Sequence, residues 1–209
     1  MQTVSIPIVQ SSSHVTTDGR IYGSGEIAVI FSNMDSNNQN EWSSIIELMN
    51  STGCMFITYN YIQYKDDQSP TLDSVVSFAR NLGVKQIILV GASRGGVASI
   101  KVAANSFDKD HIVGVVALSA PVEHEGMVFY NSEELSRIRI PKLLVNSESD
   151  ECVAGTHEMY QLVNYPKELK IYSGGAHGTE IFLKDGKAFA QKLNDFISSV
   201  FKKISHNGA

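Results

Sequence analysis

Runs of apolar residues recur along this chain at intervals that suit strands separated by helices. Apolar or β-branched runs, typical of buried strands, occur at 27–31, 54–59, 87–90, 112–118, 142–145 and 169–172. Between them, apolar or small residues repeat at helical spacing, which predicts helices near 38–52, 69–82, 94–105, 154–164 and 189–200. Strands alternating with helices imply right-handed crossovers, so the pattern predicts an α/β fold with a mostly parallel sheet and helices on both faces.

The N-terminal segment follows a different pattern. Val4 and Ile6, and then Val15, mark two short strands on either side of a turn-prone run of serines. Pro7 suits an edge strand because proline has no N–H to donate to a neighbouring strand. We therefore expect an antiparallel edge at the start of the sheet.

Two of the predicted helices begin with recognisable capping residues. Asn38 is followed three residues later by Glu41, which predicts a capping box at the start of the first crossover helix. Ser69-Pro70 is typical of a cap and a first helical residue. Gly53 and Gly83 are predicted to end these two helices.

Length and charge narrow the class of protein. A chain of 209 residues can bury one well-packed core, so we expect a single domain over residues 1–209. A net charge of −5 without a basic stripe argues against nucleic acid or an anionic membrane as a partner. The N-terminus lacks the features of a signal peptide and no stretch reaches transmembrane length, so a cytoplasmic protein is expected. Cys54 and Cys152 show neither metal-ligand spacing nor a disulfide framework, so we expect two reduced thiols and no metal or cofactor.

The strand at 87–90 leads directly into Gly91-Ala92-Ser93-Arg94-Gly95, a Gly-x-Ser-x-Gly motif followed by a helix-compatible segment. A serine at the tip of so sharp a turn takes a strained backbone conformation. Side chains two residues away on either side would collide as strand and helix close on each other, and Gly91 and Gly95 avoid this. The motif in this context favours a nucleophile elbow with Ser93 at its tip.

Other glycine motifs fit this turn less well. A Rossmann fingerprint needs glycine at the place of Ser93, and a P-loop needs Gly-Lys-Ser/Thr where this chain has Gly95-Gly96-Val97. The alternative interpretation is an ordinary strand-to-helix turn in which the serine caps the helix.

Two further loops are expected to meet this turn at the carboxyl edge of the sheet, where open α/β sheets bind their ligands. One follows the strand at 142–145 and holds Glu148 and Asp150, and the other follows the last strand and holds His177. Serine, acid and histidine in this chain order are typical of an α/β-hydrolase triad. Either carboxylate could be the acid.

From about residue 13 to residue 200, the chain resembles a serine-type α/β-hydrolase. It is most similar to the small esterases without a cap that are related in fold to dienelactone hydrolase. The likeness rests on the segments 89–96, 118–121, 146–150 and 174–179. The resemblance implies the α/β-hydrolase fold, and the interval from Leu118 to Ile140 leaves no room for a full cap domain.

The chain departs from that family at three points. Dienelactone hydrolase has cysteine at the elbow, so its substrate does not carry over. Ser32-Asn33 stands where such enzymes usually carry His-Gly, and 147–150 stands where they carry Gly-x-x-Asp. Asn tolerates the left-handed backbone that Gly would supply, so we expect the loop geometry to be kept.

Acyl transfer assigns the roles. His177 would accept the Ser93 proton and return it to the leaving group, while Asp150 holds the imidazole tautomer and an acyl-serine forms. The oxyanion needs backbone N–H donors, one from Arg94 and, by the resemblance, one from Met34.

These roles predict a serine hydrolase acting on a small carboxylic ester or thioester. An acyltransferase, a cofactor-free lyase and a non-catalytic ligand-binding protein are alternatives on the same fold. The apolar run 127–130 is predicted to form the wall of the acyl pocket.

Several side chains have two interpretations. The residues predicted to contact substrate are Tyr61, Met127 and Phe129, although the loop tyrosines, Tyr59, Tyr61 and Tyr64, could instead cover the core. His124 between two glutamates could suggest a metal ligand, but a solvated loop is the simpler interpretation. Cys152 is expected to pack near the acid, with a redox or steric role as the alternative.

Overall fold

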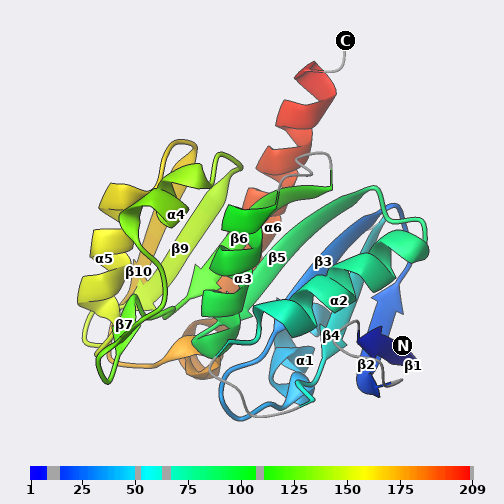
Figure 1. The fold of residues 1–209 in the computed structure, drawn as a ribbon, viewed down its shortest axis with the longest axis horizontal. Helices are drawn as coiled ribbons and strands as arrows, with labels where there is room; N and C mark the ends of the chain where they lie inside the picture. The colour runs from blue at the N-terminus through cyan, green and yellow to red at the C-terminus, as the bar shows by residue number, and fades with distance from the viewer. Residues whose placement is uncertain (9–14, 50–52, 63–66, 107–110, 208–209) are drawn as a thin grey trace.

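One large sheet runs through the molecule (Figure 1). The structure, a computed structural model, describes residues 1–8, 15–49, 53–62, 67–106 and 111–207, without the side chains of 203–207. In this part of the chain the sheet has eight strands in the order β1-β2-β4-β3-β5-β6-β9-β10. Their bounds are β1 Gln2–Ile8, β2 Val15–Gly23, β3 Ile27–Ser32, β4 Cys54–Tyr59, β5 Gln86–Ala92, β6 Ile112–Leu118, β9 Lys142–Ser147 and β10 Lys167–Tyr172.

The sheet is mostly parallel with an antiparallel start. β1 pairs antiparallel with β2, and β2 pairs antiparallel with β4. The pairs β3–β4, β3–β5, β5–β6, β6–β9 and β9–β10 are all parallel. This arrangement confirms the prediction of a parallel sheet with an antiparallel N-terminal edge.

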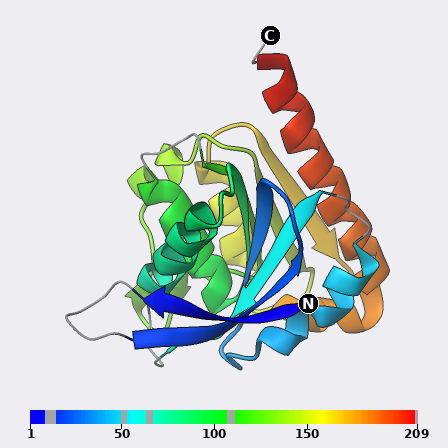
Figure 2. The same cartoon turned by 90° about the vertical axis from the view of Figure 1, so that its right-hand side faces the viewer.

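Helices cover both faces of the sheet, as predicted. One face packs against α2 (Ser69–Asn81), α3 (Arg94–Asn105), α4 (Ser132–Arg137) and α5 (Val153–Leu162). The other packs against η1 (Gln39–Trp42), α1 (Ser43–Leu48) and α6 (Phe182–Asn207). The two faces bury separate apolar clusters, which explains why the central strands are apolar throughout. The C-terminal part of α6 extends beyond the body of the molecule (Figure 2).

The strand order changes direction at β3, and this places the candidate site. The chain passes from β3 to β4 on one side and continues from β5 through β6, β9 and β10 on the other. The loops after β3 and β5 therefore open side by side at the carboxyl edge of the sheet, where α/β folds bind their ligands. Among the described residues, no helix is both long and apolar enough to cross a membrane.

The interval between β6 and β9 holds three short elements. The strands β7 (Glu123–His124) and β8 (Met127–Val128) form a hairpin, and α4 follows. The hairpin and helix are small, consistent with the prediction that no full cap domain lies between Leu118 and Ile140. The polar composition of this segment had predicted neither the hairpin nor α4.

The start of the first crossover helix differs from the prediction. Asn38 does cap η1, because its side chain accepts a hydrogen bond from the backbone N–H of Asn40. Glu41 does not complete a capping box, since its carboxylate instead binds the N–H of Met34 and the hydroxyl of Ser36. Partners in the preceding loop thus replace the local capping partner.

Candidate active site

Ser93 lies at the turn between β5 and α3 in a strained backbone conformation. Its φ of 50° and ψ of −117° fall outside the regions that side chains ordinarily allow. Its N–H donates to the carbonyl of Leu118 at 2.8 Å, and its carbonyl accepts from the N–H of Val97 at 3.0 Å. The turn is therefore held from both sides, and the serine does not cap the helix with its side chain.

The two glycines of the motif lie where backbone segments meet. A Cβ on Gly91 would stand 2.1 Å from the carbonyl oxygen of Gly95, and one on Gly95 would stand 2.2 Å from the carbonyl oxygen of Ser32. Both distances are far below van der Waals contact with backbone atoms, which cannot move aside cheaply. Strand β5, helix α3 and the end of β3 can thus approach only because these positions lack side chains.

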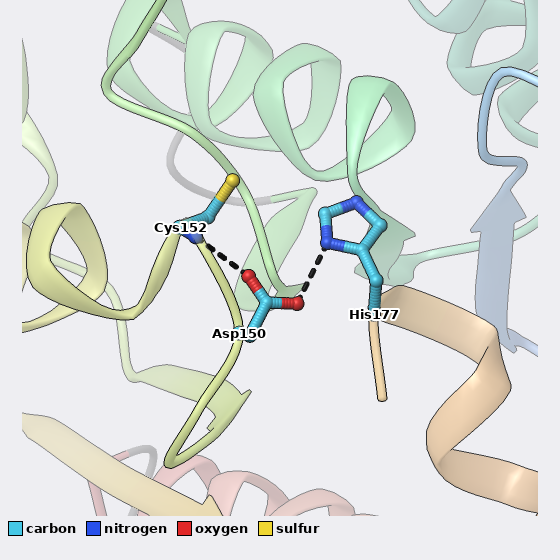
Figure 3. A group of neighbouring side chains, drawn as sticks. All are labelled: Asp150, Cys152 and His177. Carbon is cyan, nitrogen blue, oxygen red and sulfur yellow. Dashed lines mark hydrogen bonds and ion pairs between the residues drawn. The ribbon is translucent and has the colours of Figure 1, made fainter. Parts of the chain in front are cut away.

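A carboxylate and an imidazole meet beside this turn. Nδ1 of His177 lies 2.7 Å from Oδ2 of Asp150, and the other carboxylate oxygen accepts a hydrogen bond of 2.6 Å from the N–H of Cys152. Figure 3 shows the three residues together. The Asp150 side chain is 1% exposed, whereas that of His177 is 31% exposed. The acid is therefore buried behind a histidine that faces solvent.

The paired groups shift each other's ionisation. Burial opposes the charge on Asp150, but hydrogen bonds from His177, from the Cys152 N–H and from Ser119 outweigh burial and lower its pKa. The hydrogen bond to Asp150 raises the pKa of His177 against the opposing effect of burial. Asp150 is thus held ionised, and it stabilises the protonated form of the histidine.

Ser119 joins the loops that carry these residues. It is fully buried, and its hydroxyl lies 2.8 Å from Oδ1 of Asn146. The hydroxyl oxygen of Ser119 also accepts a hydrogen bond of 2.9 Å from the N–H of Gly178, the residue that follows His177. The sequence motif Leu-Ser-Ala-Pro therefore has a structural task, which is to fix the acid and histidine loops to the end of β6.

Glu148, the alternative acid, lies elsewhere. It is exposed, and its carboxylate accepts a hydrogen bond of 3.3 Å from the N–H of Gly174. Of the two acids that the sequence leaves open, the geometry pairs Asp150 with His177.

Ser93 and His177 line the same cavity, which has a volume of about 390 Å³. Its apolar lining comes from Val97, Pro121, Met127 and Phe129, so two of the predicted substrate contacts lie at the cavity. Its polar lining comes from Asp35, Arg94, His124, Glu125, Glu151 and Cys152. The Arg94 side chain is paired with Asp35, with Nε 2.5 Å from Oδ1.

Tyr61 is not part of this lining, contrary to the prediction. Its ring is buried against Tyr59, and its hydroxyl donates to the carbonyl of Asn33 at 2.6 Å. Tyr59 is also fully buried, with its hydroxyl 2.8 Å from Oγ of Ser32. Both tyrosines therefore hold the end of β3 and the start of the loop that follows it. Tyr64 lies outside the described residues.

The loop after β3 is held by side-chain hydrogen bonds that the sequence did not predict. The side chain of Asn33 donates to the carbonyl of Tyr59 and accepts from the indole N–H of Trp42. Asn33 is not among the residues with positive φ, so the expected left-handed backbone is absent and hydrogen bonds fix the loop instead.

The backbone N–H of Met34, which was predicted to be the second oxyanion donor, already donates to the side chain of Glu41. Its carboxylate accepts the N–H of Met34 at 2.9 Å and the hydroxyl of Thr179 at 3.2 Å. Burial raises the pKa of Glu41, although these hydrogen bonds oppose the shift. The Met34 N–H can serve an oxyanion only by giving up this carboxylate.

Comparison of the sequence with protein-family models and with curated proteins finds no match. Solved structures are similar in fold. One is a bromoperoxidase from Bacillus anthracis, with 13% identity over 94% of this chain and 100% of that chain and a TM-score of 0.77. Another is an esterase from Pyrococcus furiosus, with 14% identity over 95% and 91% and a TM-score of 0.77. A third is a dienelactone hydrolase from Anabaena variabilis, with 16% identity over 95% and 97% and a TM-score of 0.74.

Proposed function

We propose, from the α/β-hydrolase fold that this chain has, that it is a serine hydrolase cleaving a small carboxylic ester or thioester. The observation that carries the proposal is the strained Ser93 on a cavity that it shares with His177, whose Nδ1 meets Asp150. A serine on a sharp strand-to-helix turn, lining one cavity with a histidine that is bound to a buried acid, supplies the groups that acyl transfer requires.

Each member of the group has a distinct task in the proposed reaction. Neutral His177 takes the Ser93 proton as the oxygen attacks the carbonyl carbon, and returns that proton to the leaving group. Asp150 keeps the ring proton on Nδ1, so that Nε2 is free to act as the base, and stabilises the imidazolium. Water then attacks the acyl-serine in the same way and releases the acid.

The oxyanion would be bound at the start of α3. Arg94 is the first residue of that helix, and the N-terminus of a helix favours a negative charge. The Met34 N–H would become the second donor if the oxyanion displaces Glu41. Burial already raises the pKa of Glu41, which reduces the cost of holding this group neutral beside a developing negative charge.

The cavity supports a small acyl group. Its volume of about 390 Å³ lies at the lower end of the range of roughly 300–1,000 Å³ that ligand pockets show. The apolar residues that line it would enclose a short chain. The names of similar structures support ester cleavage itself, because they include the Pyrococcus esterase and the esterase domain of a Rhodothermus marinus protein.

Ester turnover with a matched pair of serine variants tests the proposal. Ser93→Ala should lower kcat for p-nitrophenyl acetate by roughly 10⁴-fold or more, because binding and the oxyanion donors alone leave only a residual rate. Ser198→Ala, at an exposed position on α6, should leave the rate unchanged. Equal activity in Ser93→Ala and the unmodified protein would refute the proposal.

A further inference from the structure

Cys152, Asp150 and His177 bring three different metal-ligand types into one group. One donor atom from each residue lies within 4.8 Å of the other two (Figure 3). Cys152 and His177 line the same cavity as the proposed nucleophile, Ser93. We propose that these three side chains form a Zn²⁺ site whose occupation switches the enzyme off reversibly. The spacing of these residues along the chain does not predict the group, because His177 comes from a different loop than the other two residues.

The chemistry of the donors favours zinc over magnesium or calcium. Zinc binds thiolate, imidazole and carboxylate ligands, whereas magnesium and calcium prefer oxygen alone. Tetrahedral zinc with bonds of about 2.0–2.3 Å places its ligand atoms roughly 3.3–3.6 Å apart. The three donor atoms lie within 4.8 Å of one another, and His177 meets Asp150 at 2.7 Å, so the donor atoms must shift by roughly 1 Å to reach this spacing.

The site is accessible and its charges match a divalent cation. Cys152 and His177 both line the 390 Å³ cavity, which gives an ion a route from solvent. A thiolate and a carboxylate together balance the charge of Zn²⁺, and the thiol proton would pass to the buffer. Burial and the negative charges of Asp150 and Glu151 raise the pKa of the thiol to about 11. A bound cation would offset those same charges.

Zinc at this site would remove the catalytic base whichever ring nitrogen it uses. If Zn²⁺ binds Nε2 of His177, it takes the lone pair that must accept the Ser93 proton. If it binds Nδ1, it displaces the hydrogen bond to Asp150 and leaves the proton on Nε2, which is the wrong tautomer for a base. The inhibitory effect rests on the proposed hydrolase function, whereas the binding of zinc does not.

Binding is tested first, without reference to turnover. Calorimetric titration of the full chain with Zn²⁺ should show one site per molecule. Cys152→Ser should weaken that site by at least about 100-fold, since loss of a residue that merely orients a ligand already costs about 10–100-fold. Cys54→Ala removes the other thiol, which is buried in the core, and should bind zinc as the unmodified protein does. With Co²⁺ as a probe, a thiolate-to-cobalt absorption band should appear in the unmodified protein and in Cys54→Ala but not in Cys152→Ser.

Inhibition is then measured relative to the zinc-free rate of each variant. Zinc should abolish ester turnover by the unmodified protein, and a chelator should restore it, while Cys152→Ser should need at least 100-fold more zinc for the same loss. Zinc binding with the thiolate band in a protein that cleaves no ester would support the site and refute the hydrolase. Absence of binding, or equal zinc affinity in Cys152→Ser and the unmodified protein, would overturn the inference.

Discussion

The Asp150 carboxylate is positioned by contacts to both of its oxygens. One accepts the Cys152 N–H at 2.6 Å and the other meets Nδ1 of His177 at 2.7 Å, so the carboxylate cannot rotate away from the ring. Because the Asp150 side chain is buried, water cannot easily replace either of these hydrogen-bond partners. This residue, rather than the exposed Glu148, should set the tautomer of the histidine.

Matched amide substitutions test that assignment. Asp150→Asn should lower kcat by about 10⁴-fold, because an amide can hold His177 in the wrong tautomer. Glu148→Gln removes an acid from the same loop and should change kcat less than about threefold, since its carboxylate only accepts the N–H of Gly174. Steady-state kinetics of both variants decide the matter, and the reverse ranking would transfer the role to Glu148.

The raised pKa of His177 gives the activity a predictable dependence on pH. The hydrogen bond to Asp150 favours the protonated ring, whereas catalysis requires the neutral ring. The ratio kcat/KM should therefore rise with pH through a midpoint above 6.5, the ordinary value for histidine. NMR titration of the His177 ring should show the same midpoint. In Asp150→Asn the midpoint should move down, because the substitution removes the largest effect that raises the pKa and burial still lowers it. If the His177 midpoint is the same in Asp150→Asn and in the unmodified protein, Asp150 does not raise the pKa of His177.

At this scale the sequence predicted two of the side chains that line the cavity as a candidate nucleophile and base, but not the contacts that these side chains make. Ser93 and His177 could be predicted because glycine-flanked motifs follow strands. The choice between Glu148 and Asp150 depends on the register of β9 against β10 and on the path of two loops, which no local pattern encodes. Tyr61 was misassigned for the same reason, because its partner Asn33 lies 28 residues away in the chain.

The strand–turn–helix element of β5 and α3 depends on its glycines in a way that stability measurements can test. Gly95→Ala should reduce the free energy of unfolding by roughly 3 kcal/mol or more, because the new Cβ would stand 2.2 Å from the Ser32 carbonyl oxygen. Gly186→Ala is the matched control on α6, where the nearest atom to a new Cβ lies 3.7 Å away. It should raise the free energy of unfolding by about 0.5–1 kcal/mol, since alanine suits a helix better. Equal effects in urea unfolding would mean that the turn is not under this constraint.

The elements also show how a capping signal can mislead. The pair Asn38 and Glu41 matches a capping box, yet Glu41 turns to Met34 and Thr179 because the fold brings those partners close. The pair Asn131 and Glu134 forms a true capping box at the start of α4, in a segment that composition marks only as polar. A capping box thus forms where the two side chains bond each other's backbone, and it fails at Glu41, where other partners take the carboxylate.

At the scale of the whole molecule, the contacts of the segment between β6 and β9 favour a wall over a lid. The Tyr130 hydroxyl donates to the Pro121 carbonyl at 2.8 Å, and Leu135 and Ile138 are fully buried. Met127 and Phe129 thereby face the cavity from an anchored segment. We expect such a wall to limit the length of the acyl chain in the proposed reaction, and we expect it not to open at a lipid surface.

A series of p-nitrophenyl esters from acetate to palmitate tests this limit. Each methylene that the cavity encloses contributes about 0.8 kcal/mol, or about fourfold in kcat/KM, so the ratio should climb over the first few carbons and then fall. The rate should not jump as the substrate concentration crosses the micelle threshold. A maximum at long chains, or such a jump, would indicate a mobile lid and a lipase.

The architecture was more accessible to sequence reasoning than the site. Buried parallel strands appear in the sequence as long apolar runs, and the helices between them appear as amphipathic segments, so the layers could be predicted. The antiparallel edge could be predicted from the turn-prone serines between two short apolar segments. Edge strand β10 is only half-buried, so it can begin with charged residues. Its start at Lys167 was missed because the apolar pattern begins only at Leu169. The masking of the Met34 N–H by Glu41 arises from tertiary contacts and has no counterpart in the pattern.

The central claim is that Ser93 is a nucleophile that becomes acylated. Intact-mass spectrometry after treatment with a fluorophosphonate tests it most directly, because the reagent forms a stable bond only to an activated serine. We predict a single adduct on the unmodified protein and on Ser198→Ala, and none on Ser93→Ala. An adduct that persists in Ser93→Ala, or an unmodified protein that never reacts, would contradict the account.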